Sequence, residues 1–325
     1  MAQALNVMLY GLGAIGSFYA FVLSRSQRVR LTVVARSNYE AVKQHGLHIK
    51  SANHGDHIVH PAKVVRTPAE AGETYDYVVC AHKAINQASA TKQLAPAVDG
   101  SKTCVVIIQN GVGNEDPFRE AFPKSPILSC VLPKTWVGAS QNTPGTVHHW
   151  KSENTQIGIF RNPDLEPAVE RARLDEFTSL LREGHTPFSV EDNVQIQRWE
   201  KVVWNVAWNS LTTLTMLDTH AWLRSSPDAM PLTRNLMREV IDVARRCDVP
   251  LRDELVDELI AKIQEMQPIG SSMQTDAKMG RPMEVDVILG TPVRKGRELG
   301  VSIPTLEVLY TLLLAVDSRM KPSPS

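Results

Sequence analysis

The feature that most constrains this chain is GLGAIG, residues 11–16, which follows the apolar run NVMLY and opens the helix-like run GSFYAFVL. Gly11 permits a tight turn, Gly13 lets the backbone approach a pyrophosphate, and Gly16 allows the helix to pack on the strand. The N-terminus of that helix then faces the phosphate charge. A glycine-rich turn without a ligand is the alternative. We expect a dinucleotide site that uses the whole motif: Gly11, Gly13, Ala14, Ile15 and Gly16.

The first half of the sequence alternates short apolar runs with helical stretches, which predicts a parallel sheet wound with helices. The runs are NVMLYG, GSFYAFVLS, RLTVVA, YDYVVCA, TCVVIIQ and PILSCVL. Between Thr143 and Phe160 the pattern changes to GTVHHW and NTQIGIF, two β-like runs separated by KSE. These runs predict a hairpin that extends the sheet at its edge in antiparallel fashion.

Beyond about Glu191 the strand pattern ends and an apolar period of about 3.6 residues continues to the C-terminal region. The fold class expected is therefore α/β: an N-terminal Rossmann-type, doubly wound domain over residues 1–190, followed by an all-helical domain over residues 191–325. The boundary is placed in the polar stretch 187–197. The Pro/Ser tail after Met320 is expected to be disordered.

The end of the second expected strand, RLTVVA, bears on the choice of cofactor. An Asp or Glu about 20 residues after the glycine motif favours a free ribose 2′-hydroxyl, but this run ends in Arg36-Ser37. A guanidinium suits a 2′-phosphate, so Arg36 favours NADPH. An exposed arginine without a ligand is the alternative, and Ser37 to Glu40 also has the pattern of a capping box for the next helix.

Two further strand ends carry polar residues toward the same crevice. The run YDYVVCAHKA ends with Lys83, and TCVVIIQNGVG ends with Asn110-Gly111. In open α/β sheets ligands lie outside the carboxyl ends of the strands. We therefore expect Lys83 and Asn110 to lie near the cofactor; a solvated lysine and an Asn-Gly turn are the alternatives.

The segment KVVWNVAWNSL carries Lys201, Asn205 and Asn209 at intervals of four, so a helix would align them in one polar column flanked by Trp204 and Trp208. A solvent-exposed face of an amphipathic helix is the common explanation of such a stripe. Asparagine is a poor helix former, however, and two of them in the column suggest hydrogen bonds to a specific ligand. Burial beside apolar surface would lower the pKa of a lysine toward the range in which it exchanges protons.

A second polar group follows downstream, where Ser272 precedes a loop-like stretch and Glu284 stands in PMEVDVILG. Pro282 marks an expected helix start. Glu284 and Asp286 are therefore either site residues or first-turn acids favoured by the helix dipole.

Composition excludes several classes of function. Thirty-five basic residues balance thirty-five acidic ones, so no global field draws the chain to nucleic acid or an anionic membrane. The cysteines lack metal-ligand or disulfide spacing, and His148 and His149 would lie on opposite faces of a strand, so no metal site is expected. Without a signal-like or membrane-spanning run, the expected location is the cytoplasm.

Together these motifs resemble the ketopantoate reductase (2-dehydropantoate 2-reductase) family. GLGAIG, Lys83, QNGVGNE, the K-x-x-x-N-x-x-x-N helix, SSMQTD and MEVDVILG occur in that family's order, over nearly the whole chain. The resemblance implies NADPH-dependent reduction of the 2-keto group of ketopantoate to (R)-pantoate, in the pathway to pantothenate and coenzyme A.

By resemblance, Lys201 is the general acid and Glu284 orients it or the substrate hydroxyl. Asn205 and Asn209 hold the substrate, and Ser272 binds its carboxylate. Asn110 bridges cofactor and substrate.

Two alternatives to this activity remain open. The chain could reduce another branched 2-keto acid such as ketoisovalerate, or a related ketone of secondary metabolism, with Trp204 and Trp208 reshaping the pocket. It could also sense NADPH without turnover. The apolar faces of the helical half would allow a homodimer, and the sequence does not decide between one chain and two.

Overall fold

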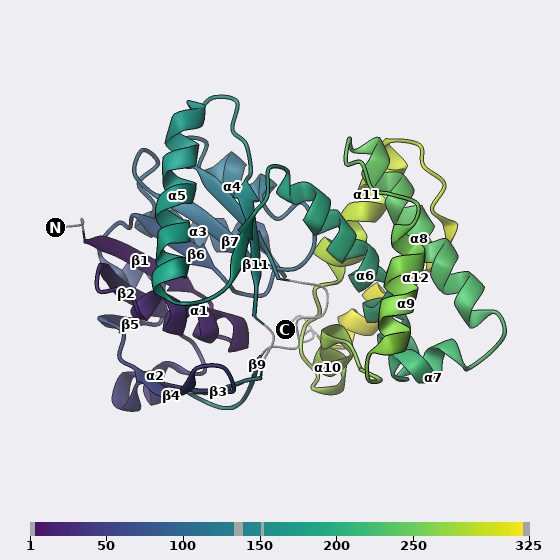
Figure 1. Cartoon of the computed structure of the whole chain (residues 1–325), viewed down its shortest axis with the longest axis horizontal. Coiled ribbons are helices and arrows are strands. Elements are labelled where there is room, and N and C mark those ends of the chain that lie inside the picture. Colours follow the sequence, from purple (N-terminus) through teal and green to yellow (C-terminus); the bar gives the residue numbers. More distant parts are fainter. Residues whose placement is uncertain (1–3, 133–138, 151–152, 321–325) are drawn as a thin grey trace. The chain divides into compact units, whose positions relative to one another are not determined.

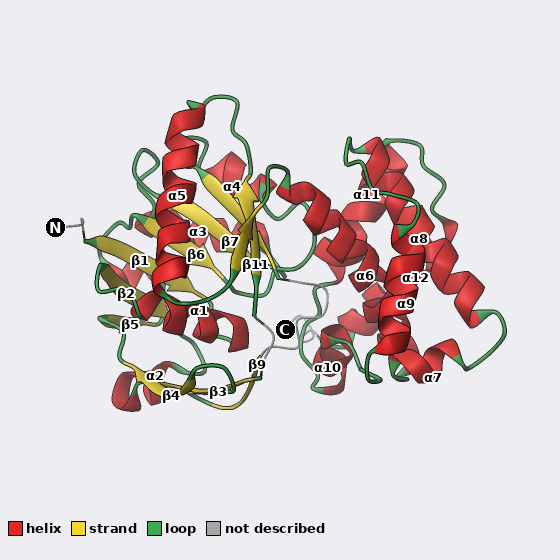
Figure 2. Cartoon of the chain, viewed as in Figure 1, coloured by secondary structure: helices red, strands yellow, loops and turns green. Residues whose placement is uncertain are grey.

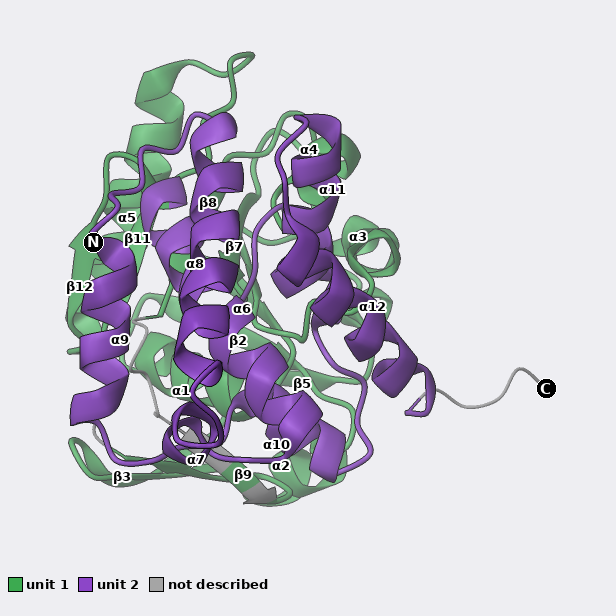
Figure 3. Ribbon diagram, turned by 90° about the vertical axis from the view of Figure 1, so that its right-hand side faces the viewer, with its two compact units in different colours: residues 1–109, 114–194 green, residues 110–113, 195–325 purple. Residues whose placement is uncertain are grey.

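The computed structural model describes residues 4–132, 139–150 and 153–320. Its contacts divide the chain into two compact units, coloured separately in Figure 3. Unit 1 comprises Met1–Gln109 and Asn114–Val194, and unit 2 comprises Asn110–Gly113 and Gln195–Ser325. The sequence did not indicate that residues 110–113 group with the helical part.

The main sheet of unit 1 has the strand order β12-β11-β8-β7-β6-β1-β2-β5. Its strands are β1 (Leu5–Tyr10), β2 (Val29–Val34), β5 (Lys63–Val65), β6 (Tyr77–Cys80), β7 (Cys104–Ile108), β8 (Ile127–Val131), β11 (Thr155–Ile159) and β12 (Phe188–Val190). From β5 to β8 all neighbours are parallel, whereas β11 pairs with β8 in antiparallel register. The Rossmann-type, doubly wound domain expected from the alternating pattern is confirmed.

Helices cover both faces of this sheet (Figure 1). They are α1 (Ala14–Ser24), α2 (Tyr39–His45), α3 (Gln87–Leu94), α4 (Asp116–Ala121) and α5 (Pro167–Glu183), with short 3₁₀ turns η1 (Pro68–Ala71) and η2 (Ala95–Ala97). Alternate residues of β1 enter different cores: Val7 packs in the cluster of Phe18 and Phe177, and Met8 in the cluster of Phe118. The period of two along a strand therefore divides the core between the two helical layers.

A second, four-stranded sheet of unit 1 was not expected. Its order is β4-β3-β10-β9, with β3 (Leu47–Ser51), β4 (Gly55–Val59), β9 (Ala139–Thr143) and β10 (Thr146–His149). It packs against α1, where the His149 ring stacks on Phe18 with centroids 4.4 Å apart. His149 is buried and His148 exposed, as the strand alternation predicts.

The expected hairpin of GTVHHW with NTQIGIF is wrong. The first run forms β10, which pairs with β9 and β3 in the small sheet, whereas the second forms β11 in the main sheet. Only the antiparallel extension of the main sheet is confirmed, through β11 and β8. The partner of β10 depends on burial against α1, which local alternation does not reveal.

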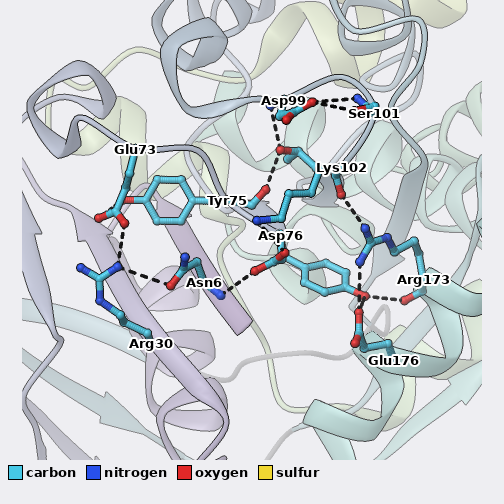
Figure 4. Close-up of polar contacts among 12 residues, drawn as sticks. Asn6, Arg30, Glu73, Tyr75, Asp76, Asp99, Ser101, Lys102, Arg173 and Glu176 are labelled. Carbon is cyan, nitrogen blue, oxygen red and sulfur yellow. Dashed lines mark hydrogen bonds and ion pairs between the residues drawn. The ribbon is translucent and has the colours of Figure 1, made fainter. Parts of the chain in front are cut away.

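At the amino ends of β1, β6 and β7, polar side chains form a network that Figure 4 shows. The Asp76 carboxylate accepts the backbone N–H of Asn6 at 2.8 Å and lies 3.2 Å from Lys102 Nζ. Tyr77 donates its hydroxyl to Glu176 at 2.8 Å, and burial raises the pKa of that phenol. These groups satisfy one another, at the end of the strands opposite to the glycine motif.

Among its described residues, the secondary structure of unit 2 consists of helices without a strand, as expected, and Figure 2 shows no strand there. Its elements are α6 (Val194–Thr215), α7 (Thr219–Leu223), α8 (Ala229–Arg246), α9 (Leu255–Glu265), α10 (Ser272–Lys278), the π-helical turn η3 (Asp286–Gly290), α11 (Thr291–Glu298) and α12 (Pro304–Ser318). In the described part of the chain, no helix combines the length and apolar character needed to cross a bilayer. The expected disordered tail lies outside the described residues after position 320.

Candidate active site

The glycine motif of unit 1 forms the turn between β1 and α1. Gly11 has a φ of +103°, and an added Cβ would lie 2.4 Å from the backbone nitrogen of His82. An added Cβ on Gly16 would lie 1.9 Å from the carbonyl oxygen of Gly11. At Gly13 an added Cβ would meet nothing within 4 Å. Packing therefore requires two of the glycines, while the third leaves open space beside the helix start.

The N-terminus of α1 is suited to an anion. Gly13 is the N-cap residue, and the first turn contains no acidic side chain. Ala14 and Ile15 are partly exposed at this end. Because the helix dipole is not neutralised from within its own first turn, the open space at Gly13 fits the phosphate groups of a dinucleotide.

Arg36 follows the carboxyl end of β2 and is exposed. The capping box that was one explanation of Ser37 does not form: α2 begins at Tyr39, its N-cap is Asn38, and the Asn38 side chain makes no capping bond. The Asn38 amide instead donates to the carbonyl oxygen of Leu12 at 2.6 Å, next to the glycine turn. This leaves Ser37 exposed beside Arg36.

A buried amide network lies beneath the glycine turn, and sequence reasoning missed it. Gln87 donates to Gln109 at 2.7 Å and to Asn114 at 3.3 Å, and Gln109 donates to the His82 carbonyl oxygen at 2.8 Å. Burial first, and then the charge of Arg36, lowers the pKa of His82 to about 4. His82 is therefore neutral at physiological pH, and Arg36 lies near enough for its charge to act on this ring.

The only sequence signal for this network was its place directly after strands, in CAHKAINQ and IIQNGVGN. Lys83, the residue chosen there, is exposed after β6. Its neighbour His82 is the one that contacts the glycine turn. The sequence led to Lys83 at this strand end, and it did not indicate that His82 packs against the turn.

In unit 2, residues 110–113 form a strap bound to the helical elements. The backbone N–H of Val112 donates to the Val287 carbonyl oxygen at 3.0 Å, and Arg198 Nη1 donates to the Gly111 carbonyl oxygen at 3.0 Å. Gly111 has a φ of +92°, and an added Cβ would lie 2.4 Å from the Val287 oxygen. The Asn-Gly turn and a role for Asn110 are thus compatible, because the turn presents the Asn110 side chain.

That side chain meets one of the predicted acids. Asn110 Nδ2 donates to Glu284 Oε2 at 3.4 Å. The two acids of MEVD have different surroundings. Glu284 precedes the π-helical turn η3, whereas Asp286 lies in it and pairs with Arg294 at 2.5 Å. The backbone N–H of Met283 donates to the buried Asp317 at 2.8 Å, which anchors the chain just before Glu284.

Lys201 lies in α6 with its pKa lowered to about 7. Burial is the largest cause, the charge of Arg198 adds to it, and the carboxylate of Glu284 opposes it. A lysine with a pKa near neutrality both gives up and regains a proton in water. The arrangement places such a proton donor in the field of a carboxylate that also accepts an amide hydrogen bond.

The polar column of α6 is not a solvent-exposed face. Asn205 is 7 % exposed and Asn209 is 5 % exposed. Among the described residues, the side-chain nitrogen of Asn205 and the indole nitrogen of Trp208 are buried and find no hydrogen-bond partner. Buried donors without partners are rare in folded proteins, so these two are suited to an acceptor that a ligand brings.

Ser272 is placed differently from its neighbour. It is the first residue of α10 and is exposed, whereas Ser271 is the N-cap and accepts the Thr212 hydroxyl at 2.8 Å. Thr212 belongs to α6, so Ser271 ties α10 to the helix of the column. The structure thus brings Lys201, Glu284 and Asn110 together within unit 2, and it gives Ser272 no hydrogen bond to them. Among the described residues, no cluster of His, Cys, Asp or Glu is suited to a metal ion.

Comparisons with known proteins identify the family of the chain. The family model described as ketopantoate reductase PanE/ApbA matches residues 7–162, and its C-terminal counterpart matches residues 193–317. A 2-dehydropantoate 2-reductase of Nostoc sp. is 27 % identical, with 96 % of this chain and 95 % of that protein aligned.

Solved structures are similar over the same length. The crystal structure of 2-dehydropantoate 2-reductase from Methylococcus capsulatus has a TM-score of 0.85 and 33 % identity, and the match covers 98 % of this chain and 99 % of that one. D-mandelate dehydrogenase, solved with NADH and anilino(oxo)acetate, has a TM-score of 0.81, with 97 % and 99 % covered. At 22 % identity it shows the fold alone. By these matches, the chain belongs to the ketopantoate reductase family.

Proposed function

We propose that this protein reduces the 2-keto group of ketopantoate to (R)-pantoate with NADPH, as a step toward pantothenate and coenzyme A. The observation that carries the proposal is the group formed by Lys201, Glu284 and Asn110 in unit 2. A lysine pKa near 7 and a hydrogen-bonded carboxylate beside it suit proton donation to a carbonyl oxygen. Family membership adds the substrate class.

NADPH binding is assigned to the glycine motif of unit 1. The open space at Gly13 and the α1 N-terminus without acids fit a pyrophosphate. Arg36, exposed at the end of β2, fits a 2′-phosphate. When bound, NADPH supplies a hydride to a carbonyl carbon. Lys83 completes the set from unit 1, as an exposed cation for the cofactor or the substrate acid.

The remaining steps belong to unit 2. As C2 of the substrate gains the hydride, negative charge develops on its oxygen, and the Lys201 ammonium transfers a proton to that oxygen. Lys201 then regains a proton from water. Glu284 orients the ammonium group, and Asn110 holds the carboxylate in place. We assign substrate contacts to Asn205 and Asn209, and Ser272 to the substrate carboxylate.

Another branched 2-keto acid is the second candidate substrate. Trp204 and Trp208 are the reason to consider it, because both are buried on α6, where they stand 5.8 Å apart in an edge-to-face pair. Two large rings beside the column leave less room than smaller side chains would. A protein that binds NADPH without turnover is the third candidate, and the near-neutral pKa of Lys201 argues against it.

The test is NADPH oxidation with ketopantoate, ketoisovalerate, other branched 2-keto acids and simple ketones, repeated with NADH. Saturable turnover that is most efficient with ketopantoate supports the proposal. Turnover only with another acid retains the mechanism and changes the substrate.

Lys201→Ala tests the chemistry separately from binding. It should abolish turnover while the NADPH dissociation constant, followed by fluorescence, stays near that of the parent protein. Loss of NADPH binding in this variant would assign the lysine to the cofactor and overturn the mechanism.

A further inference from the structure

Arg198 is a buried cation that the sequence gave no reason to select. It lies in the polar stretch QIQRWEK and is 2 % exposed. It precedes Lys201 by three residues on α6, so the two side chains lie on neighbouring positions of one helix face. A buried guanidinium stays charged in proteins, and it is costly unless the surrounding groups bind it.

Arg198 makes a hydrogen bond to the strap of residues 110–113. Its Nη1 donates to the Gly111 carbonyl oxygen at 3.0 Å. On the other side of this peptide segment, Val112 is bound to Val287 at 3.0 Å. The strap is therefore held from α6 and from η3, and the Asn110 amide reaches Glu284 from this fixed position.

Arg198 also acts on Lys201 through its charge. Two positive charges one helical turn apart repel, so the guanidinium disfavours the ammonium form of Lys201. Within unit 2, the charged groups that act on Lys201 are Arg198, from the same helix, and Glu284, from the segment before η3. Their effects on the pKa of Lys201 are opposite: Arg198 lowers it and Glu284 raises it.

We propose that Arg198 is a positioning residue for the reduction, which holds the Asn110–Gly113 strap and places a fixed positive charge beside Lys201. This inference rests on the proposed function for its effect on turnover. Its structural content, a charge that acts on Lys201 and a bond that holds Gly111, does not depend on which substrate is used.

Three substitutions separate the two roles. Arg198→Lys keeps the charge, Arg198→Gln keeps an N–H donor for Gly111 without the charge, and Arg198→Met keeps neither. Arg297→Gln is the matched control, because Arg297 is exposed on α11 and pairs with Glu307 at 2.7 Å. Each variant is compared with the parent protein by circular dichroism and thermal unfolding before its kinetics are measured.

The first readout is the pH dependence of kcat/KM for ketopantoate. Loss of the charge in Arg198→Gln should move the alkaline limb of the profile to higher pH by roughly one unit, because Lys201 then keeps its proton to higher pH. Arg198→Lys and Arg297→Gln should leave the limb where it is. In Arg198→Met, kcat at neutral pH should also fall about tenfold, since the strap is no longer held.

The second readout needs no turnover. In protein labelled with ¹³C at the lysine ε-carbon, the Lys201 signal, assigned by its loss in Lys201→Arg, should titrate at higher pH in Arg198→Gln than in the parent. An unchanged Lys201 titration in that variant would overturn the electrostatic role even if ketopantoate is not the substrate. Strictly additive effects of Arg198→Met and Asn110→Ala on kcat would overturn the strap role, because residues that act through one contact are not independent.

Discussion

Asn110 and Glu284 are separated by 174 positions in the sequence, yet the amide of one donates to the carboxylate of the other at 3.4 Å. The contact joins a strap that follows β7 to the segment that precedes η3, both within unit 2. It fixes the carboxylate whose charge acts on Lys201. The proposed proton donor, Lys201, thus depends on a residue that follows a strand of unit 1 in the sequence.

Because the Glu284 carboxylate raises the pKa of Lys201, removing this carboxylate should shift the pH profile of kcat/KM to lower pH. In the parent protein, kcat/KM should fall as pH rises through about 7, because the general acid then loses its proton. Glu284→Gln removes the charge that raises the pKa of Lys201, so this fall should begin at lower pH, with kcat reduced about 100-fold.

Asp286→Asn is the control for that experiment, since Asp286 pairs with Arg294 at the start of η3. It should leave the pH profile unchanged. A profile that moves equally in both variants would mean that the general charge of this segment, and not Glu284 itself, acts on Lys201.

Lys201 should also make stability depend on pH. Its pKa is lowered from 10.5 to about 7 in the folded chain, so between these values the unfolded state binds more protons. The free energy of unfolding should therefore rise with pH across that window. Lys201→Met should be more stable than the parent at pH 7 and below, and the difference should shrink toward pH 10.5. Chemical denaturation across this range measures it, and a constant difference would contradict the lowered pKa.

The sequence predicted the parts of this fold that local patterns determine. Alternating runs gave the parallel sheet, and the glycine motif located the turn between β1 and α1, because turn geometry and strand burial are set within a few residues. The predicted partner of β10 was wrong. A strand of four residues can pair with several others, and the partner that β10 takes depends on the face of α1 that it covers.

The residues of the candidate site likewise fall into those that the sequence could select and those that it could not. Lys201, Asn205 and Asn209 could be selected from their spacing on one helix. Arg198 and His82 could not, because nothing near them in the sequence distinguishes a buried cation or ring from an exposed one. Their roles come from Gly111 and Gly11, which lie far away along the chain.

Gly11 and Gly13, two glycines of the motif, should respond differently to replacement by alanine. Gly11→Ala forces a φ of +103° on an L-residue and brings its Cβ to 2.4 Å from His82, so unfolding free energy should fall by about 2 kcal/mol or more. At Gly13 a methyl group has space, so Gly13→Ala should keep the parent stability and weaken NADPH binding. Thermal unfolding and NADPH titration of both variants distinguish the two. Equal destabilisation would show that Gly13 is also a packing requirement.

Cofactor preference should depend on Arg36. Arg36→Asp replaces a donor for the 2′-phosphate by an acceptor for the ribose hydroxyl, so the ratio of kcat/KM for NADPH over NADH should fall by about 100-fold. Lys124→Asp, the same charge change at the exposed amino end of β8, should leave the ratio unchanged. An unchanged ratio in Arg36→Asp would show that another residue recognises the phosphate.

The indole of Trp208 should discriminate between the candidate substrates. Its nitrogen is buried without a partner and lies on the face of α6 that carries Lys201, seven residues and about two turns further along. Helical side chains lean toward the N-terminus, so we expect this ring to extend toward Lys201. Ketopantoate carries a hydroxyl that can accept the indole N–H, and ketoisovalerate does not.

Trp208→Phe keeps a ring and removes the donor, so KM for ketopantoate should rise up to about tenfold while KM for ketoisovalerate stays nearly constant. Trp204→Phe on the same helix controls for ring size. If KM rises equally for both substrates in Trp208→Phe, the indole shapes the pocket and does not bind the hydroxyl.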